Sequence, residues 1–201
     1  MSKPTKVIVL CEDNRTFSFT RSYLKRCGIQ RGIRPVISPR GSAFTFVVNS
    51  FPAQVNAYRL AKARVHTWLI AVVDADTGTV AQRIGEMDRG LIQAQEPRVR
   101  AIRIQDEMIA RLVPRRNIET WLLALNDVVP VENPPLNETT DYKKDVTEFR
   151  HYDWEGIIKP ATAAFYSIIR PNAQLPANVL ESLRHGIDEM RRVEELEELA
   201  G

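Results

Sequence analysis

The sequence has 201 residues and a mass of 22.9 kDa, which suits one well-filled globular domain with or without a small appendage, and not two large ones. A hydrophobic content of 44% and a charged content of 26% exclude extensive disorder, and no apolar stretch approaches the roughly 20 residues that cross a bilayer. The net charge of +3 conceals an asymmetry, because residues 1–116 carry 20 Lys or Arg against 9 Asp or Glu, whereas residues 117–201 carry 8 against 16.

Strands and helices are predicted to alternate along the first 125 residues. Continuous β-branched and apolar runs predict the strands, and apolar residues three or four apart predict the helices. The predicted strands are 6–11, 33–37, 68–73 and 108–113, and the predicted helices are 16–26, 44–64, 79–94 and 118–125. We expect Gly28 to end the first helix, Ser42 and Asn117 to cap the starts of two others, and Pro52 to break the 44–64 helix into two pieces.

The remaining third of the chain has a different character. Residues 127–153 are rich in Pro, Asn, Glu and Thr and predict a long polar loop, whereas 154–169 and 177–199 predict two helices. We therefore expect an α/β domain over 1–126, the loop, and a helical extension over 154–201 that packs on the first domain. The alternating part predicts a parallel sheet of about four strands with helices on both faces, whose ligands bind beyond the carboxyl ends of the strands.

The cysteines and histidines offer little support for zinc or a disulfide framework. Cys11 and Cys27 are too few for such a framework and form no CxxC pair, and the three histidines lie far apart in the sequence. We expect reduced thiols, and any metal would have to be held by oxygen.

Acidic residues follow three of the predicted strands. Glu12 comes after the first strand, Asp74 and Asp76 come after the third, and Glu119 opens the helix beyond the fourth. If these side chains meet at one edge of the sheet, their negative charges repel unless a cation lies among them. Mg2+ or Mn2+ fits, since hard cations prefer oxygen ligands. Each acid taken alone is also consistent with a helix cap or a loop charge.

Two strand ends resemble the glutamate and DxD motifs of the Toprim fold. These are Leu10-Cys11-Glu12 and Val73-Asp74-Ala75-Asp76, and the 114–122 segment resembles a further block seen in Toprim-like proteins of phage-defence neighbourhoods. The fold is shared by topoisomerases, primases, small nucleases and the OLD-family nucleases. The resemblance covers about residues 6–125, and the glycine-rich approach to the glutamate that is usual in the family is missing here.

The resemblance implies a Mg2+- or Mn2+-dependent phosphodiesterase, a nuclease acting on DNA or RNA. Glu12 would be a general acid/base or metal ligand, Asp74 and Asp76 would hold metal, and Glu119 is a further candidate ligand for a second ion. The basic first half of the chain suits such an anionic partner. Arg115 and Arg116, directly before a helix, are the favoured phosphate ligands, together with Lys143.

Other classes of protein remain open. The 74–78 segment is close to the DxDGT motif of haloacid dehalogenase-type phosphatases, but Thr77 is an extra residue. A receiver domain would need Lys159 much closer to Asp74. The chain is short for a glycosyltransferase. The main alternative is a non-catalytic Toprim-like subunit that docks on an ATPase or another defence component. The basic half is also consistent with a solvated surface that attracts the acidic half. We expect a cytoplasmic protein with no membrane partner, and the sequence leaves homo-oligomerisation open.

Overall fold

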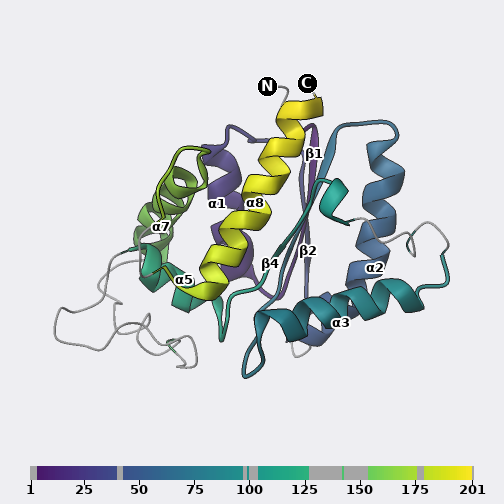
Figure 1. The fold of residues 1–201 in the computed structure, drawn as a ribbon, viewed down its shortest axis with the longest axis horizontal. Coiled ribbons are helices and arrows are strands. Elements are labelled where there is room, and N and C mark those ends of the chain that lie inside the picture. Colours follow the sequence, from purple (N-terminus) through teal and green to yellow (C-terminus); the bar gives the residue numbers. More distant parts are fainter. Residues whose placement is uncertain are drawn as a thin grey trace.

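The computed structural model describes residues 4–39, 43–96, 99, 104–126, 142, 154–175 and 179–200. It confirms the predicted fold class, an α/β protein with one four-stranded parallel sheet and helices on both faces (Figure 1). The predicted polar loop over 127–153 lies almost wholly outside the described residues, so its structure stays a prediction. None of the described helices combines the length and the apolarity that crossing a bilayer requires.

The order of the strands places a switch point in the middle of the sheet. The strands are β1 (Lys6–Cys11), β2 (Ile33–Ile37), β3 (Thr67–Val72) and β4 (Ile109–Leu112), in the order β2-β1-β3-β4. The chain leaves β1 for β2 on one side and then crosses to β3 on the other side. Cys11 pairs with Val72, so β1 and β3 end at the same level. In open parallel sheets, ligands bind at such a reversal, beyond the carboxyl ends of the strands.

The helices form one layer on each face of the sheet. They are α1 (Asn14–Arg26), α2 (Ala43–Lys62), α3 (Val80–Gln93), α5 (Ile118–Leu125), α7 (Trp154–Ile169) and α8 (Glu181–Ala200), with a short 3-10 helix at Ile104–Asp106. Helices α2 and α3 cover one face, and α1, α5, α7 and α8 cover the other (Figure 1). Helices α7 and α8 therefore share a hydrophobic core with the sheet.

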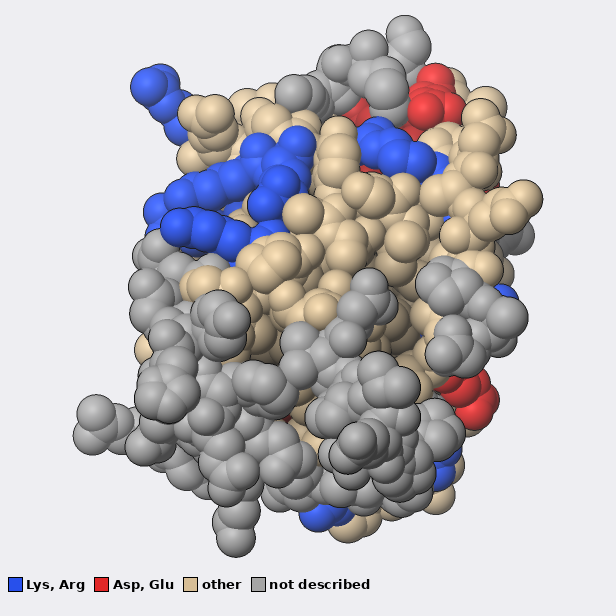
Figure 2. Space-filling view, turned by 90° about the vertical axis from the view of Figure 1, so that its left-hand side faces the viewer, with Lys and Arg blue, Asp and Glu red and all other residues tan. Residues whose placement is uncertain are grey.

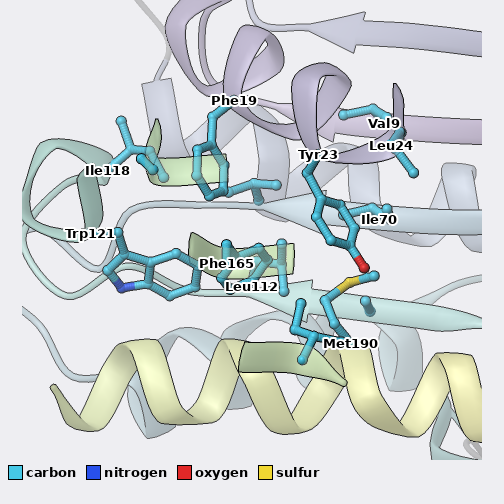
Figure 3. Packing of buried hydrophobic residues seen from close by; sticks show 14 of the residues in the cluster. Val9, Phe19, Tyr23, Leu24, Ile70, Leu112, Ile118, Trp121, Phe165 and Met190 are labelled. Carbon is cyan, nitrogen blue, oxygen red and sulfur yellow. The ribbon is translucent and has the colours of Figure 1, made fainter. Parts of the chain in front are cut away.

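Alternating side chains of the central strands supply both cores. In β3, Trp68 and Ile70 belong to the core under α1 and α8, whereas Leu69 and Ala71 belong to the core under α2 and α3. This follows from the two-residue period of a strand, and it explains why β3 is apolar throughout. In the first core, Phe165 of α7 lies among aromatic rings of other helices, with its centroid 5.5 Å from that of Phe19, 5.3 Å from that of Tyr23 and 6.0 Å from that of Trp121 (Figure 3).

Polar contacts attach α8 to elements made much earlier in the chain. Tyr23 Oη donates to Glu194 Oε1 at 2.9 Å, and Trp68 Nε1 donates to Glu197 Oε2 at 2.9 Å. Trp121 Nε1 donates to Ser182 Oγ, also at 2.9 Å. Buried Tyr and Trp side chains keep their polar atoms satisfied in this way. Helix α8 thus completes the packing and the hydrogen bonding of one face of the sheet.

Gly186 lets α8 approach the indole ring of Trp121. A Cβ atom at position 186 would overlap Trp121 Cη2 and lie 3.0 Å from Cζ2 and Cζ3. We expect Gly186→Ala to lower the free energy of unfolding by about 1–3 kcal/mol, because the ring is fully buried and cannot move aside. Gly85→Ala is the control, since a Cβ there meets only the Arg89 guanidinium at 3.6 Å; it should stabilise α3 by up to about 1 kcal/mol. Urea denaturation measures both, and equal effects of the two substitutions would contradict the packing argument.

The prediction that Pro52 divides the 44–64 helix is wrong, because α2 runs without interruption from Ala43 to Lys62. Proline removes one backbone hydrogen bond, but here tertiary packing offsets that loss. Phe51 and Val55 on either side of it are fully buried in the second core. Gly90 of α3 approaches Pro52 so closely that an added Cβ would lie 3.3 Å from the ring.

Most of the other predicted boundaries agree with the structure. Helix α1 starts two residues before the prediction because Asp13 caps it, with Asp13 Oδ1 accepting from Thr16 N at 2.8 Å. Gly28, with φ of 81°, follows its end, where Ile29 N donates to Leu24 O in a Schellman-type arrangement.

Asn117 caps α5 as predicted. Helix α8 starts at Glu181, four residues after the predicted start. Ser42 lies outside the described residues, and both cysteines are free thiols.

Candidate active site

The structure brings the ends of β1 and β3 together at the switch point. Glu12 follows β1 directly, and its Oε1 accepts a hydrogen bond from the backbone N of Asp74 at 2.7 Å. Asp74 is buried, with 7% of its surface exposed, whereas Glu12 and Asp76 are half-buried. Two residues that are 62 positions apart in the sequence are therefore in direct contact at the edge where ligands of parallel sheets bind.

Burial and the neighbouring acids both affect the ionisation of Glu12. Burial, together with the charges of Asp76 and Asp13, raises the pKa of Glu12 from its ordinary value of 4.5 to about 7. The hydrogen bond from the Asp74 backbone and the nearby Arg83 guanidinium act in the opposite direction. The carboxyl groups thus lie close enough to repel one another, which is the condition that a bound cation relieves.

Arg83 of α3 fastens the segment that carries the two aspartates. Its Nε donates to Asp74 O at 3.2 Å and its Nη2 donates to Ala75 O at 3.3 Å, while Nη1 pairs with Glu86. The guanidinium also lies 4.0 Å from the centroid of the Phe44 ring. Only 6% of Arg83 is exposed. Sequence analysis missed this residue, although it lies four residues before Met87 on the buried face of α3.

Backbone contacts join the loops after β3 and β4. Ala75 N donates to Pro114 O at 2.8 Å, and Asp76 forms an isolated antiparallel bridge with Arg116. Asp76 has φ of 51° and Arg116 has φ of 71°, both in the left-handed region that non-glycine residues rarely adopt. Strained residues of this kind persist where the surrounding structure holds them, and they are concentrated at functional sites.

Glu119 makes a polar contact with α1. It is 2% exposed, and its Oε1 accepts from Arg15 Nη1 of α1 at 3.0 Å. Its Oε2 is buried and has no hydrogen-bond partner among the described residues. A buried carboxylate oxygen without a partner is a place where water or a cation is expected. The structure therefore connects Glu119 to the start of α1 rather than directly to Glu12.

The predicted phosphate ligands are only partly placed. Arg115 and Arg116 are half-buried and directly precede Asn117, the cap of α5, as the sequence predicts. Arg116 is next to Asp76 in the bridge between the two loops. Lys143 lies outside the described residues.

Carboxylates are suitable ligands for a divalent cation, but the described residues do not form a complete set of protein ligands around one point. Within the described part of the chain, no three His, Cys, Asp or Glu side chains are grouped so that they could hold a metal ion. Mg2+ does not require such a cage, because it is usually bound by one or two carboxylates and completed by water and substrate phosphates. The crowding at Glu12 and the unpartnered oxygen of Glu119 are consistent with a cation at this edge.

Other candidate groups have structural roles. Trp121 is fully buried and belongs to the core. Burial and the nearby Asp13 charge raise the pKa of Cys11 to about 12, so its thiol stays protonated and unreactive.

Comparison with protein-family models, with curated proteins and with solved structures finds no match.

Proposed function

We propose that the protein is a metal-dependent phosphodiesterase, a nuclease of the Toprim type acting on DNA or RNA. One observation carries the proposal: Glu12 at the end of β1 contacts Asp74 at the end of β3, at the switch point of a parallel sheet. This is the pair of strand ends whose sequences resemble the glutamate and DxD motifs. Asp76, two residues further along, supplies a third acid that affects Glu12 electrostatically.

The acids have separate roles in this proposal. Asp74, Asp76 and Glu12 would hold Mg2+ or Mn2+, which activates water and neutralises charge on the phosphate when it is bound. Glu12 would also move a proton to or from the reacting groups. Arg83 keeps the aspartates in position through the carbonyl groups of Asp74 and Ala75. Glu119, with one buried oxygen free of partners in the described residues, is the candidate ligand for a second ion.

Arginines beside the acids would hold the substrate phosphate. Arg116 is joined to Asp76 through the backbone bridge, and Arg115 lies next to it. Both precede the capped start of α5, where the dipole of the helix also favours anions. Lys143 remains a proposed phosphate ligand on the sequence alone. A setting in phage defence, and an ATPase as partner, rest on the resemblance alone.

The proposal is tested by ion binding and by cleavage measured on the same variants. Manganese binding followed by electron paramagnetic resonance should show at least one ion that Mg2+ displaces. At least one of four labelled substrates, single-stranded or duplex DNA or RNA, should be cleaved in the presence of Mg2+ or Mn2+. Glu12→Gln and Asp76→Asn should each reduce cleavage by about 100-fold or more, because the loss of a general acid/base or of a metal ligand has effects of this size. Circular dichroism should show unchanged folding.

Matched substitutions away from the site serve as controls. Glu96 and Asp106 are exposed, and Glu96→Gln and Asp106→Asn should leave both ion binding and cleavage unchanged. Cleavage retained by both site variants would contradict the nuclease assignment. A folded protein that binds no divalent ion and cleaves no nucleic acid would instead match the alternative, a non-catalytic subunit that docks on a partner protein.

A further inference from the structure

A long part of the chain contains basic residues and no acidic ones. Between Asp13 and Asp74 the sequence has ten Lys or Arg and no Asp or Glu. This part forms α1, β2, α2 and β3, and β2 is an outer strand of the sheet. Within the protein, these charges can be neutralised only by Glu12 and Asp13, which come just before this part, or by elements later in the chain.

Later elements neutralise only some of these cations. Glu119 pairs with Arg15, and Glu107 pairs with both Arg59 and Lys62. Arg34 donates to the neutral side chain of Gln54. The ion pairs lie at the start of α1 and at the end of α2. No carboxylate of the described chain forms an ion pair with the cations in the second half of α1 or in the turn after it.

Four exposed cations remain there, and we call them the α1 basic surface: Arg21, Lys25, Arg26 and Arg31. The side chains of Arg21, Lys25 and Arg31 make no hydrogen bond or ion pair with other described residues. Arg26 donates only to neutral groups, the backbone oxygen of Lys159 at 2.8 Å and the hydroxyl of Thr162 at 3.3 Å. The side of the molecule that carries α1 and α7 shows Lys and Arg side chains gathered in its upper half (Figure 2). Unneutralised charge of one sign on one face attracts a ligand of the opposite sign.

The helix sets the spacing of this surface. Arg21 and Lys25 are four residues apart and so lie on the same face of α1, separated by about 6 Å along its axis. Arg26 follows directly, and Arg31 comes just after the turn that ends the helix. Helix α1 has 13 residues and starts two positions after Glu12, so it extends about 20 Å from the acidic edge of the sheet. An extended anion bound along α1 would have one end near the candidate active site.

We propose that the α1 basic surface binds the phosphate backbone of a nucleic acid and guides it towards the acidic edge of the sheet. Three of its four cations are Arg, whose planar guanidinium binds phosphate through two hydrogen bonds. The inference extends the proposed nuclease function to the way in which the substrate is held. Binding itself needs no cleavage, so it can be measured without the metal.

Two other partners fit this surface less well. The large hydrophobic residues exposed in the described chain are Leu60, Val65, Ile92 and Leu199, and none of them is on α1. A membrane-binding helix places apolar side chains beside its cations, and the centre of a protein interface is apolar. A surface of cations without apolar neighbours is typical of backbone contacts to nucleic acid, which are made by Lys and Arg and release counterions.

The test measures binding by fluorescence anisotropy in EDTA, so that cleavage plays no part. The probes are one labelled sequence as single-stranded DNA, single-stranded RNA, duplex DNA and duplex RNA, at several salt concentrations. We expect the variant with Arg21→Ala and Lys25→Ala to bind at least one probe on the order of 10-fold more weakly than wild type. The slope of log affinity against log salt should become shallower by about 2, close to one for each lost phosphate contact.

The control variant removes two exposed arginines outside this surface, with Arg89→Ala on α3 and Arg184→Ala on α8. It carries the same change of charge, and it should keep both the affinity and the salt slope. Equal losses in the two variants, or no binding of any probe by wild type, would overturn the inference. So would binding to phosphatidylserine vesicles, lost in the α1 variant, without binding to nucleic acid.

The outcomes also separate this inference from the proposed function. Binding that depends on Arg21 and Lys25, in a protein that cleaves no nucleic acid, would support the α1 basic surface and contradict the nuclease. Cleavage with unchanged binding in the α1 variant would support the nuclease and overturn the surface.

Discussion

Glu12→Gln is expected to make the metal-free protein more stable than wild type at pH 8, by about 2–3 kcal/mol, and to change its stability little near pH 4.5. The pKa of Glu12 is raised from 4.5 in the unfolded chain to about 7 in the folded protein, chiefly by burial. The folded state therefore binds this proton more tightly, and wild-type stability falls as pH rises from about 4.5 to about 7. Gln stays neutral and keeps an oxygen that accepts from Asp74 N.

The measurement is urea denaturation of both proteins between pH 4.5 and 8, in EDTA. The difference between variant and wild type is the quantity to follow, because other groups titrate in the same window. Burial lowers the pKa of His185, for example, and that residue makes stability fall as pH drops below about 6.5. A difference that stays constant from pH 4.5 to 8 would contradict the raised pKa. Added Mg2+ should stabilise wild type more than the variant at pH 8, since a bound cation favours the charged form of Glu12.

Arg83→Met is expected to lower the free energy of unfolding by about 3–5 kcal/mol, the usual cost of removing one member of a buried charged network. Met keeps much of the apolar stem but leaves the carbonyl groups of Asp74 and Ala75 without their donors. The same change removes a positive charge that lowers the pKa of Glu12, so that pKa should rise above about 7. Stability and the ionisation of Glu12 thus respond to one side chain.

Urea denaturation measures the first effect, and the pH dependence of the stability difference between Arg83→Met and its double variant with Glu12→Gln measures the second. Arg89→Met is the matched control, because Arg89 lies on the same helix but is exposed; its stability should change by no more than about 0.5 kcal/mol. A buried Arg83 that could be replaced at no cost would contradict the claim that it holds the aspartate segment in place.

The sequence predicts the sheet well because the relevant signals are local. The apolar run 6–11 is typical of a strand that is buried on both faces of a parallel sheet. Asn117 caps α5 through contacts with residues no more than three positions away. The prediction at Pro52 is wrong because the relevant contacts are not local. Its effect on α2 depends on packing against the sheet and against Gly90, which are distant in sequence.

The candidate site divides in the same way. The positions of Glu12 and Asp74 at strand ends follow from the alternation of elements, and the structure adds their direct contact. The pairing of Glu119 with Arg15 and the anchoring role of Arg83 depend on how α1, α3 and α5 are oriented, which no local pattern specifies. One feature of the sequence indicates Arg83: it is a charged residue at a position on the buried face of an amphipathic helix.

The attachment of α8 has a consequence for the order of events during synthesis. Strand β3 leaves the ribosome long before α8, yet Trp68 finds its carboxylate partner, and the face under α1 its full cover, only when residues 181–200 have been made. A chain that emerges from its N-terminus therefore exposes this apolar surface until α8 has been made, and chaperones bind surfaces of this kind.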